Sequence, residues 1–306
     1  MQELAQHVFI ETAYAGVTLA AINWSHGLIL IDSPFRPEDT RAWRSTLLNL
    51  GGGVDRLLVN LDVHFDRTLG TRSMDCTVVG HEKMAAVFRN RPVTFKTQGT
   101  ETGAEWELFN GLGSIRWVPP EITFTEQLSI NWGEYPLVLA SHPGPSIGAI
   151  WAILPEQRVA FVGDALLPDQ PPFLASANLP AWISTLQPLL TPAYQDYLLV
   201  SGRGGLVAHS QVRSQVLYLE KIHQMLEHLA ARKAVPHETE TLVSYCIFKG
   251  GEPDCNPWPQ TNGRYTWGAG GAEVETGDYQ ATIRVWSQAD PNHSLKWTFD
   301  FTIDLP

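Results

Sequence analysis

The stretch Asn60-Leu61-Asp62-Val63-His64-Phe65-Asp66-Arg67-Thr68-Leu69-Gly70 decides how the rest of the chain is interpreted. It follows the apolar run Arg56–Val59, which has the length of a buried strand. Asp62, His64 and Asp66 stand at alternate positions where the chain leaves that strand, so their side chains can converge on one point. Because Asp and His are common in loops, the match alone is a weak signal, and the downstream sequence has to support a metal site.

Composition limits the classes of protein to which this chain can belong. Its 306 residues, 44% of them hydrophobic, suffice for one large domain, or a domain with an appendage, around a sizeable core. The net charge of -11 gives no attraction to phosphate backbones or anionic lipids, and no run of Lys and Arg forms a local exception. We therefore expect a small-molecule substrate, and neither a nucleic-acid partner nor a membrane partner.

The N-terminus and the cysteines indicate a cytoplasmic protein. The first seven residues lack the basic start and apolar core of a signal peptide, and no run is long enough to span a membrane. Cys76, Cys246 and Cys255 form no metal-type pair, and their odd number argues against a disulfide framework. We expect ordinary thiols, with a Cys246–Cys255 pairing left open.

Patterns of apolar residues, glycine and proline predict strands and helices that lead into the ligand stretch and away from it. Pro37 with two acidic residues after it predicts a helix start, and Gly51 predicts its end. Residues 90–106 are polar and predict a surface excursion that borders the site. The predicted elements of the first half are strands within residues 8–31, a helix over 37–51, strands over 56–60 and 77–80, and a helical stretch from His81.

The second half is rich in strands, and polar residues follow the ends of several of them. Gly, Pro and Asn separate the apolar runs between Ile122 and Val162, as hairpins require. His142 and Asp164 each come directly after such a strand. The strand Tyr197–Val200 ends in Ser201-Gly202-Arg203-Gly204-Gly205, and an amphipathic helix follows from about Gln211 to Arg232.

The order of these features resembles the metallo-β-lactamase superfamily. The resemblance covers about Val8 to Arg232: a strand that ends in Leu-Ile-Asp, a His-x-His-x-Asp-His-like region at Asp62 to Arg67, a ligand loop at His142, Gly163-Asp164, and a Gly-His-Gly-like loop at Gly202-Arg203-Gly204. It implies an α+β fold, the αββα four-layer sandwich of two mixed sheets flanked by helices. We place this domain at residues 1–235 and a C-terminal β-strand appendage at residues 236–306.

The resemblance also implies a set of metal ligands, and this chain departs from it at three positions. The first metal of the family pattern corresponds here to Asp62, His64 and His142, a set that suits zinc, iron(II) or manganese. The second metal would use Asp66, Asp164 and two histidines, whose positions hold Arg67 and Arg203. A guanidinium stays protonated and cannot coordinate a cation, so the second metal is not expected.

The two arginines give a physical reason for this departure. Without a cation between them Asp66 and Asp164 would repel one another, and Arg67 and Arg203 can replace the missing charge. The alternative is that both arginines point to solvent. We interpret Asp32 as a supporting or turn residue and His81 as a structural histidine.

The leading hypothesis is a metal-dependent hydrolase with one divalent metal at Asp62, His64 and His142, with Asp164 as a further ligand. Zinc is the first expectation, with iron, manganese or no metal as alternatives. Asp66 would orient a water or take its proton, and Arg67 or Arg203 would hold an anionic substrate group or an oxyanion. An ester, lactone, thioester or amide fits the resemblance. The alternatives are a non-catalytic, metal-free protein of this fold that binds a small anion or a protein partner, and an iron site for redox work.

The appendage carries two alternating segments, Tyr279–Ser287 and Leu295–Ile303. Each presents an apolar face, and the residues between them are numerous enough to close a hairpin. An isolated hairpin is only marginally stable. We therefore expect it to pack on its own chain, with the Gly-rich loop Trp267–Gly271 as a lid near the cleft, and a homodimer contact is the alternative.

Overall fold

Two mixed β-sheets form the centre of the computed structural model, which describes residues 1–91, 115–168, 170, 172–174, 176–231, 247–249, 252–254, 277–286 and 294–303. The first sheet has the order β1 (Gln2–Ala5), β2 (Val8–Glu11), β3 (Leu19–Asn23), β4 (Gly27–Ile31), β5 (Asp55–Val59), β6 (Thr77–His81) and β7 (Ile122–Phe124). The second has the order β13 (Leu206–Val207), β12 (Leu198–Ser201), β11 (Val159–Gly163), β10 (Ile150–Leu154), β9 (Leu137–Ser141) and β8 (Gln127–Ile130).

Helices cover the outer face of each sheet. They are α1 (Pro37–Leu47), α2 (Phe65–Thr68), α3 (Thr71–Met74), α4 (Glu82–Asn90), α5 (Leu179–Leu186) and α6 (His209–Ala231), with 3-10 turns at Leu48–Leu50, Gln187–Leu190 and Pro192–Tyr194. α1 begins at the predicted proline, carries Glu38 and Asp39 in its first turn, and is followed by Gly51 at φ 66°. A positive φ is readily available to glycine, which explains why the helical segment stops there.

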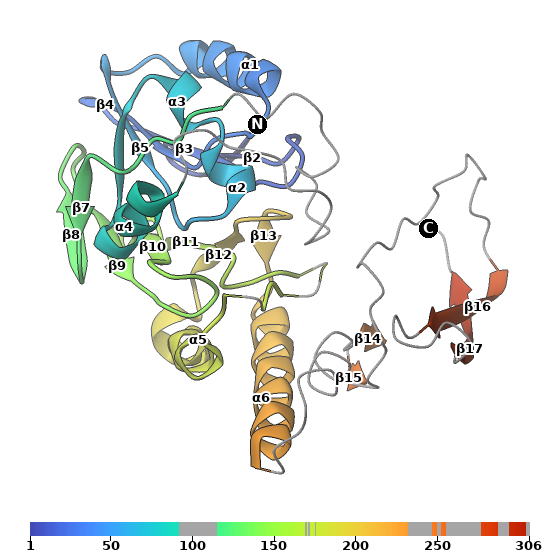
Figure 1. The fold of residues 1–306 in the computed structure, drawn as a ribbon. Helices are drawn as coiled ribbons and strands as arrows, with labels where there is room; N and C mark the ends of the chain where they lie inside the picture. The colour runs from blue at the N-terminus through green and yellow to red at the C-terminus, as the bar shows by residue number, and fades with distance from the viewer. Residues whose placement is uncertain are drawn as a thin grey trace.

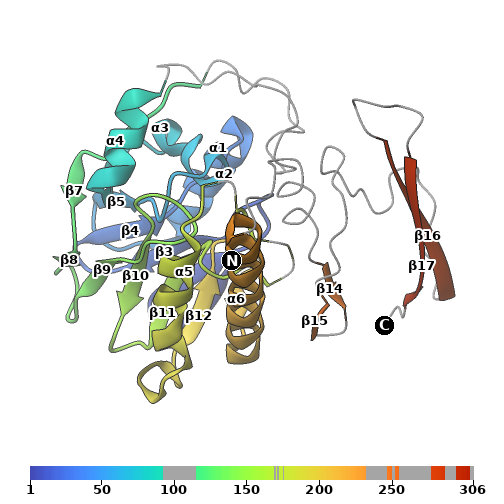
Figure 2. The ribbon, with the colours of Figure 1, turned by 60° about the horizontal axis from the view of Figure 1, so that its bottom comes forward.

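Three of the apolar clusters join the four layers. One lies between the sheets and includes Ile29, Val59 and Phe161. A second joins the first sheet to α1 through the fully buried Trp43, and a third joins the second sheet to α5 and α6 around Trp182. Figures 1 and 2 show α1 and α3 on one side of the sheets and α5 and α6 on the other. The αββα sandwich predicted from the sequence is therefore confirmed.

The topology brings several strand ends to one edge of the sandwich. β4 and β5 are parallel, with Ile31 opposite Val59, and β11 and β12 are parallel, with Gly163 opposite Ser201. The carboxyl ends of parallel strands lie at the same edge of a sheet. The segments that follow these four strands carry the residues singled out in the sequence.

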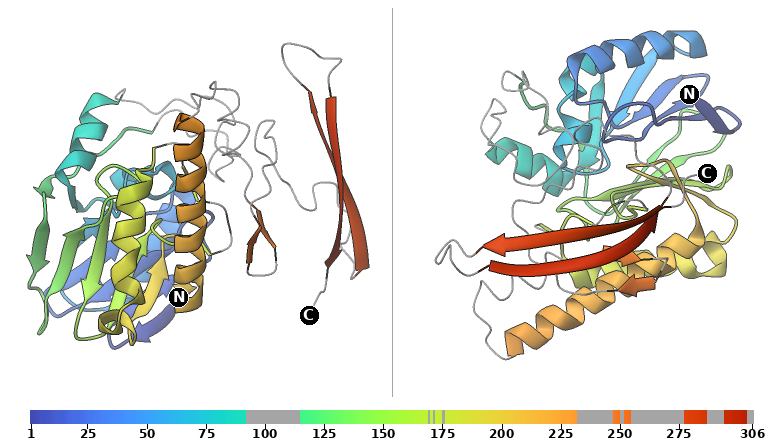
Figure 3. Two further views of the ribbon diagram at one scale, coloured as in Figure 1. Left: turned by 90° about the horizontal axis from the view of Figure 1, so that it is seen from below. Right: turned by 90° about the vertical axis from the view of Figure 1, so that its right-hand side faces the viewer.

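The C-terminal part contains strands where the sequence predicts them. β16 (Gly277–Trp286) pairs antiparallel with β17 (Ser294–Ile303), and Ile283 stands opposite Trp297. Figure 3 shows them as a two-stranded ribbon, and β14 (Ile247–Lys249) pairs with β15 (Glu252–Asp254). The packing of the hairpin on the core and the dimer contact stay predictions. The excursion over 92–106, the loop 267–271 and the Cys246–Cys255 pairing lie outside the described residues.

Across the described ranges, no helix combines the length and the apolar character that crossing a bilayer requires.

Candidate metal centre

The loop between β5 and α2 is shaped by its own polar side chains. Asp62 Oδ1 accepts a hydrogen bond from the backbone N–H of His64 at 2.9 Å, and Thr68 Oγ1 donates to the carbonyl of His64 at 2.7 Å. Short side-chain-to-backbone bonds of this kind fix a turn without help from the sheet. The loop therefore holds Asp62 and His64 in a defined relation before any ligand binds.

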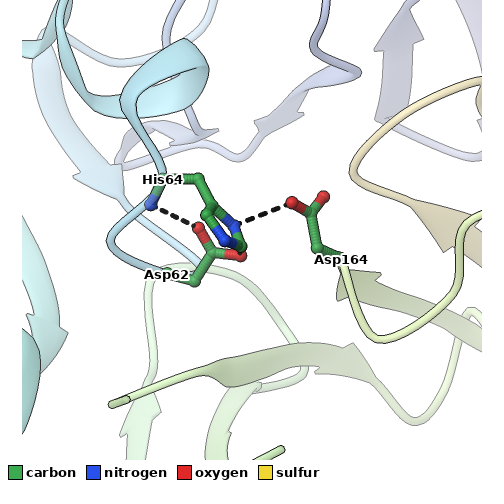
Figure 4. Close-up of side chains that lie close together, drawn as sticks. All are labelled: Asp62, His64 and Asp164. Carbon is green, nitrogen blue, oxygen red and sulfur yellow. Dashed lines mark hydrogen bonds and ion pairs between the residues drawn. The ribbon is translucent and has the colours of Figure 1, made fainter. Parts of the chain in front are cut away.

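Asp62, His64 and Asp164 come together as a group of three potential metal ligands. One ligand atom from each lies within 4.8 Å of the other two. Among the described residues, no other group of three His, Cys, Asp or Glu side chains meets this distance. His64 Nδ1 lies 2.8 Å from Asp164 Oδ2 and 3.1 Å from Asp62 Oδ2, as Figure 4 shows for the three side chains. Both carboxylates are buried, whereas the His64 side chain is 19% exposed.

These three residues fit one divalent ion. His64 Nδ1 and Asp62 Oδ2 are buried, yet neither has a partner that satisfies hydrogen-bond geometry, despite their short separation. Together with Asp164 they lie close enough for one ion to contact all three side chains. A single imidazole nitrogen with carboxylate oxygens is a donor set that manganese, iron(II) and zinc accept.

Without an ion, charge couples the three groups strongly. Burial alone would lower the pKa of His64, but the charges of Asp62 and Asp164 outweigh it and raise that pKa to about 10. The pKa of Asp164 lies well below its usual range, because Arg203, Arg67 and His64 together overcome the effect of its burial. A proton on His64 is thus the competitor that a metal ion must displace.

Arg67 lies at the centre of the cluster, completely buried among three carboxylates. Its Nη1 is 3.0 Å from Asp32 Oδ2, its Nε is 3.1 Å from Asp62 Oδ1, and its Nη2 bonds Asp164 Oδ1. Because the guanidinium is completely buried among these carboxylates, the geometry favours a role for Arg67 in holding them in place. The substrate contact considered from the sequence stays a prediction.

Arg203 bridges Asp66 and Asp164, the two acids expected at the second metal. Its Nη1 pairs with Asp66 Oδ2, and its Nη2 lies 3.3 Å from Asp164 Oδ2. Its guanidinium carbon stands 4.7 Å from the ring centre of Phe173, and its side chain is 9% exposed. The prediction that an arginine lies within salt-bridge distance of Asp66 or Asp164 is confirmed for both arginines.

A second metal ion does not fit this arrangement. The oxygens of Asp66 and Asp164 that would receive it are paired with Arg67 and Arg203. A guanidinium offers no lone pair to a cation, and its positive charge repels one. The positive charges of the two arginines replace the charge of the second ion.

The backbone around Arg67 is fixed by a buried polar network. Its carbonyl accepts hydrogen bonds from Ser33 N at 3.2 Å, Ser33 Oγ at 3.0 Å and Asn60 Nδ2 at 3.1 Å. Asp32, which holds the guanidinium, also accepts from the backbone N–H of Leu61 at 3.0 Å and adopts φ 59°. Burial raises the pKa of Asp32 to about 7 even though Arg67 opposes the shift. The predicted supporting role of Asp32 is borne out by these contacts.

The backbone of Gly202 packs against the guanidinium of Arg67. A Cβ at this position would stand 2.3 Å from Arg67 Nη1 and 2.9 Å from Arg67 Cζ. We expect Gly202→Ala to displace Arg67 and to lower the free energy of unfolding by about 1–3 kcal/mol, the usual range for overpacking. Urea denaturation checks this. A Gly51→Ala control, with φ 66° and open space around it, isolates backbone strain, so an equal loss in both variants would contradict the steric account.

His142 lies apart from the group of three ligands. Its ring stacks on Trp151 with 3.7 Å between ring centres and 14° between planes, and its backbone N–H donates to Ala149 O at 3.0 Å. Burial lowers its pKa to about 4, so the ring is neutral at pH 7. Among the described residues the ligand group contains Asp164, as expected, but not His142, whose ring is held against Trp151 of the second sheet.

His81 and Ser141 form a pair that resembles a nucleophile and its base, but the tautomer argues against this. His81 Nδ1 accepts from the backbone N–H of Lys83 at 3.0 Å, so the proton of the neutral ring lies on Nε2, 3.2 Å from Ser141 Oγ. A protonated Nε2 cannot take the proton of the serine. His81 is a structural histidine that caps α4, as interpreted from the sequence.

Comparisons with known proteins place the fold. A scan of family models finds no match, and neither does a search of curated proteins. A metallo-β-lactamase from Pontibacter korlensis matches at 19% identity and a TM-score of 0.56, over 72% of this chain and 97% of that one. A metallo-β-lactamase family protein from Thermus thermophilus matches at 21% identity and a TM-score of 0.56, over 79% and 87%.

A double mutant of a sec-alkyl sulfatase matches at 15% identity and a TM-score of 0.58, over 80% of this chain and 45% of that one. Identities this low bear on architecture alone. Together with the two sheets, the helical layers and the strand-end site, these matches show that the chain has the metallo-β-lactamase fold.

Proposed function

We propose that this protein is a hydrolase that works with one divalent metal ion held by Asp62, His64 and Asp164. The observation that carries the proposal is the convergence of these three ligand atoms within 4.8 Å, two of them buried without a hydrogen-bond partner. The matched folds, which include metallo-β-lactamases and a sulfatase, support hydrolysis as the reaction class. A divalent ion there would acidify a water and polarise the oxygen of the bond to be cleaved.

Three residues around the proposed ion, Arg67, Asp66 and Arg203, have separate roles in the proposed reaction. Arg67 positions the two carboxylate ligands, since it pairs with Asp62 Oδ1 and Asp164 Oδ1. Asp164 Oδ2, which faces His64, is also 3.3 Å from Arg203 Nη2, so an ion there would share this oxygen with Arg203. Asp66 Oδ1 is buried without a hydrogen-bond partner and is the acceptor to which a water could donate its proton. Of the two arginines, Arg203 is the one with some solvent exposure, so it is the arginine that can meet an anionic substrate atom.

The donor set refines which metal and which substrate we propose. One imidazole with two carboxylates is a harder donor set than the one expected from the sequence, which also includes the imidazole of His142. We therefore propose manganese or iron(II) beside zinc. The substrate is a small molecule with an ester, lactone, thioester or amide bond. The partly exposed His64 marks the side from which it enters.

A second candidate is a metal-free protein of this fold that binds a small anion or a protein partner. The specific observation in its favour is charge balance. Asp62, Asp66 and Asp164 face three cations, Arg67, Arg203 and a protonated His64, so the cluster is neutralised without an ion. The fourth acid, Asp32, has a pKa of about 7 and adds only a partial charge at neutral pH.

Metal binding and hydrolysis in matched variants separate the two candidates. The chelator-treated protein is loaded with manganese, iron(II) or zinc and assayed on a panel of aryl esters, lactones and thioesters. His64→Ala is compared with His223→Ala, which removes a half-buried histidine of α6 outside the cluster. The proposal expects one ion per chain and a metal-dependent activity, both lost in His64→Ala alone. A parent that binds no ion and hydrolyses no substrate would refute it and favour the binding protein.

Metal binding should release about one proton and should strengthen as pH rises. The pKa of His64 is about 10 in the metal-free protein, so a proton must leave Nδ1 before an ion binds at pH 7.5. The apparent affinity should therefore rise about tenfold per pH unit between pH 7.5 and 9. Calorimetry in buffers of different ionisation enthalpy measures the proton count. An affinity that stays flat over this range would mean that His64 is neutral before the ion arrives.

A further inference from the structure

A cavity of about 290 Å³ lies outside the metal centre, at the junction of α1, α3 and the segment that follows α2. Figure 1 shows α3 beside α1 at this end of the sandwich. The cavity shares no lining residue with the carboxylate and arginine cluster. Its walls are formed by Phe35, Pro37, Leu69, Gly70, Arg72, Ser73, Ile115 and Arg116.

The walls of the cavity are chemically divided. Phe35 and Leu69 are buried apolar side chains, and Ile115 packs against them. Arg72 and Arg116 are exposed and carry positive charge. Of the described residues that line the cavity, none is acidic. Phe35 and Leu69 close the floor from beneath, with only 1% and 2% of their surfaces exposed, so Ile115 and the two cations form the accessible lining. Two cations beside a small apolar surface suit an organic anion.

Arg72 and Arg116 have no partner among the described residues, in a chain whose net charge is -11. Throughout the described ranges, neither guanidinium takes part in an ion pair or a hydrogen bond with another residue. Asp39, in the first turn of α1, is paired with Arg36 at 2.5 Å. Two unpaired guanidinium forks at one cavity therefore remain available to a carboxylate or phosphate from outside.

The cavity is built before any ligand arrives. A Cβ on Gly70 would stand 1.8 Å from Pro34 O, so the backbone of this wall is packed tightly against the segment before α1. Arg44 Nη1 donates to the carbonyl of Ser73 at 2.8 Å and joins α3 to α1. A preformed site loses less conformational entropy when it binds its ligand.

We propose that this cavity is a binding site for a small organic anion, with a carboxylate or phosphate head between Arg72 and Arg116 and an apolar body against Ile115. The volume is at the lower end of small-molecule sites, about 300–1,000 Å³, so the ligand is of the size of a bicyclic aromatic acid or smaller. The site does not depend on the proposed hydrolase activity, because none of its residues belongs to the metal centre.

Calorimetric titration of the full chain, treated with chelator, tests the proposal with 1-naphthoate and 1-naphthyl phosphate as probes. The neutral 1-naphthol measures the apolar part alone, and inorganic phosphate measures the head alone. We expect at least one of the two anionic naphthyl probes to bind about tenfold or more tightly than 1-naphthol, and the stronger one to identify the head group. Equal affinity for 1-naphthol and both anions, or no binding of either anion, would overturn the proposal.

Variants of the two arginines locate the binding. Arg72→Gln and Arg116→Gln should each weaken the stronger probe about tenfold, whereas Arg213→Gln, which removes an exposed arginine of α6, should leave it unchanged. His64→Ala should also leave it unchanged, so that a failure of the metal centre is distinguished from a failure of this site. Loss of binding in His64→Ala with no effect of Arg72→Gln or Arg116→Gln would assign the anion to the metal centre and refute the cavity site.

Discussion

Replacing Arg67 with methionine is expected to lower the free energy of unfolding by about 3–5 kcal/mol, the range seen when one partner of a buried charge network is removed. The side chain is 0% exposed and faces Asp32, Asp62 and Asp164. Methionine fills similar space but leaves these buried carboxylates without their shared cation. Urea denaturation at pH 7 measures the loss. The matched control is Arg158→Met, whose pair with Asp196 is 57% and 65% exposed and should contribute about 0–1 kcal/mol.

The pH dependence of this loss has a definite sign. The pKa of Asp164 is held well below its usual range by Arg203 and Arg67 against the effect of burial, so in the parent Asp164 adds stability above its unfolded pKa near 3.8 that is lost as pH falls. Without Arg67 the carboxylates bind protons more readily. The difference between Arg67→Met and the parent should therefore shrink as pH falls from about 7 to about 4. A loss below about 1 kcal/mol at pH 7 would contradict the central place of Arg67.

The double variant Arg67→His, Arg203→His should turn the arginine pair into ligands for a second ion. Both positions hold histidine in the family pattern that the sequence resembles, and the acids Asp66 and Asp164 are already in place. With the cations removed, these acids need a metal ion to offset their repulsion. We expect two ions per chain and a stability that depends on metal, by about 2.7 kcal/mol when the ion is present at about 100 times its dissociation constant.

Thermal unfolding with and without chelator checks this expectation. The control is a variant in which the exposed Arg158 and Arg213 are both replaced by histidine, which adds the same two imidazoles outside the cluster. Its unfolding temperature should respond to metal as the parent does. A folded Arg67→His, Arg203→His protein that binds no more metal than the parent would show that the arginines do not stand in for a cation.

Much of the fold could be predicted because its signals are local. The strands before and after the ligand stretch, the helix that begins at Pro37 and the hairpin near the C-terminus each have a periodicity or a boundary residue in the sequence. α5, over Leu179–Leu186, was missed because its signals are weak: Asn178 caps it and Pro180 lies in its first turn, but the segment is short and mostly apolar. Its amphipathic pattern becomes visible only when Trp182 is known to face the second sheet.

The pairing of charged residues in the site could be predicted from the sequence, but the packing of its histidine rings could not. The acids and arginines follow strands whose ends the topology brings together, so the pairing of Arg203 with Asp66 and Asp164 could be inferred from charge alone. The absence of His142 from the group of three ligands could not. It depends on the ring of His142 stacking on Trp151, a contact set by the packing of β10 and not by the ligand motif.

Phe173 was also missed from the sequence. It lies 4.7 Å from the guanidinium carbon of Arg203 and 5.6 Å, ring to ring, from His64. It belongs to the segment between β11 and α5, where no periodic pattern marks its position. A phenylalanine in a loop after the predicted ligand Asp164 is the one signal that could have suggested it.

Metal stoichiometry of the unmodified protein tests the central claim most directly, namely that Arg67 and Arg203 stand in place of a second cation beside a single metal site. The protein is treated with chelator, incubated with excess manganese or zinc at pH 8.5, freed of unbound metal by gel filtration and analysed by elemental mass spectrometry. The account predicts one ion per chain, absent from the His64→Ala variant. Two ions per chain would contradict it.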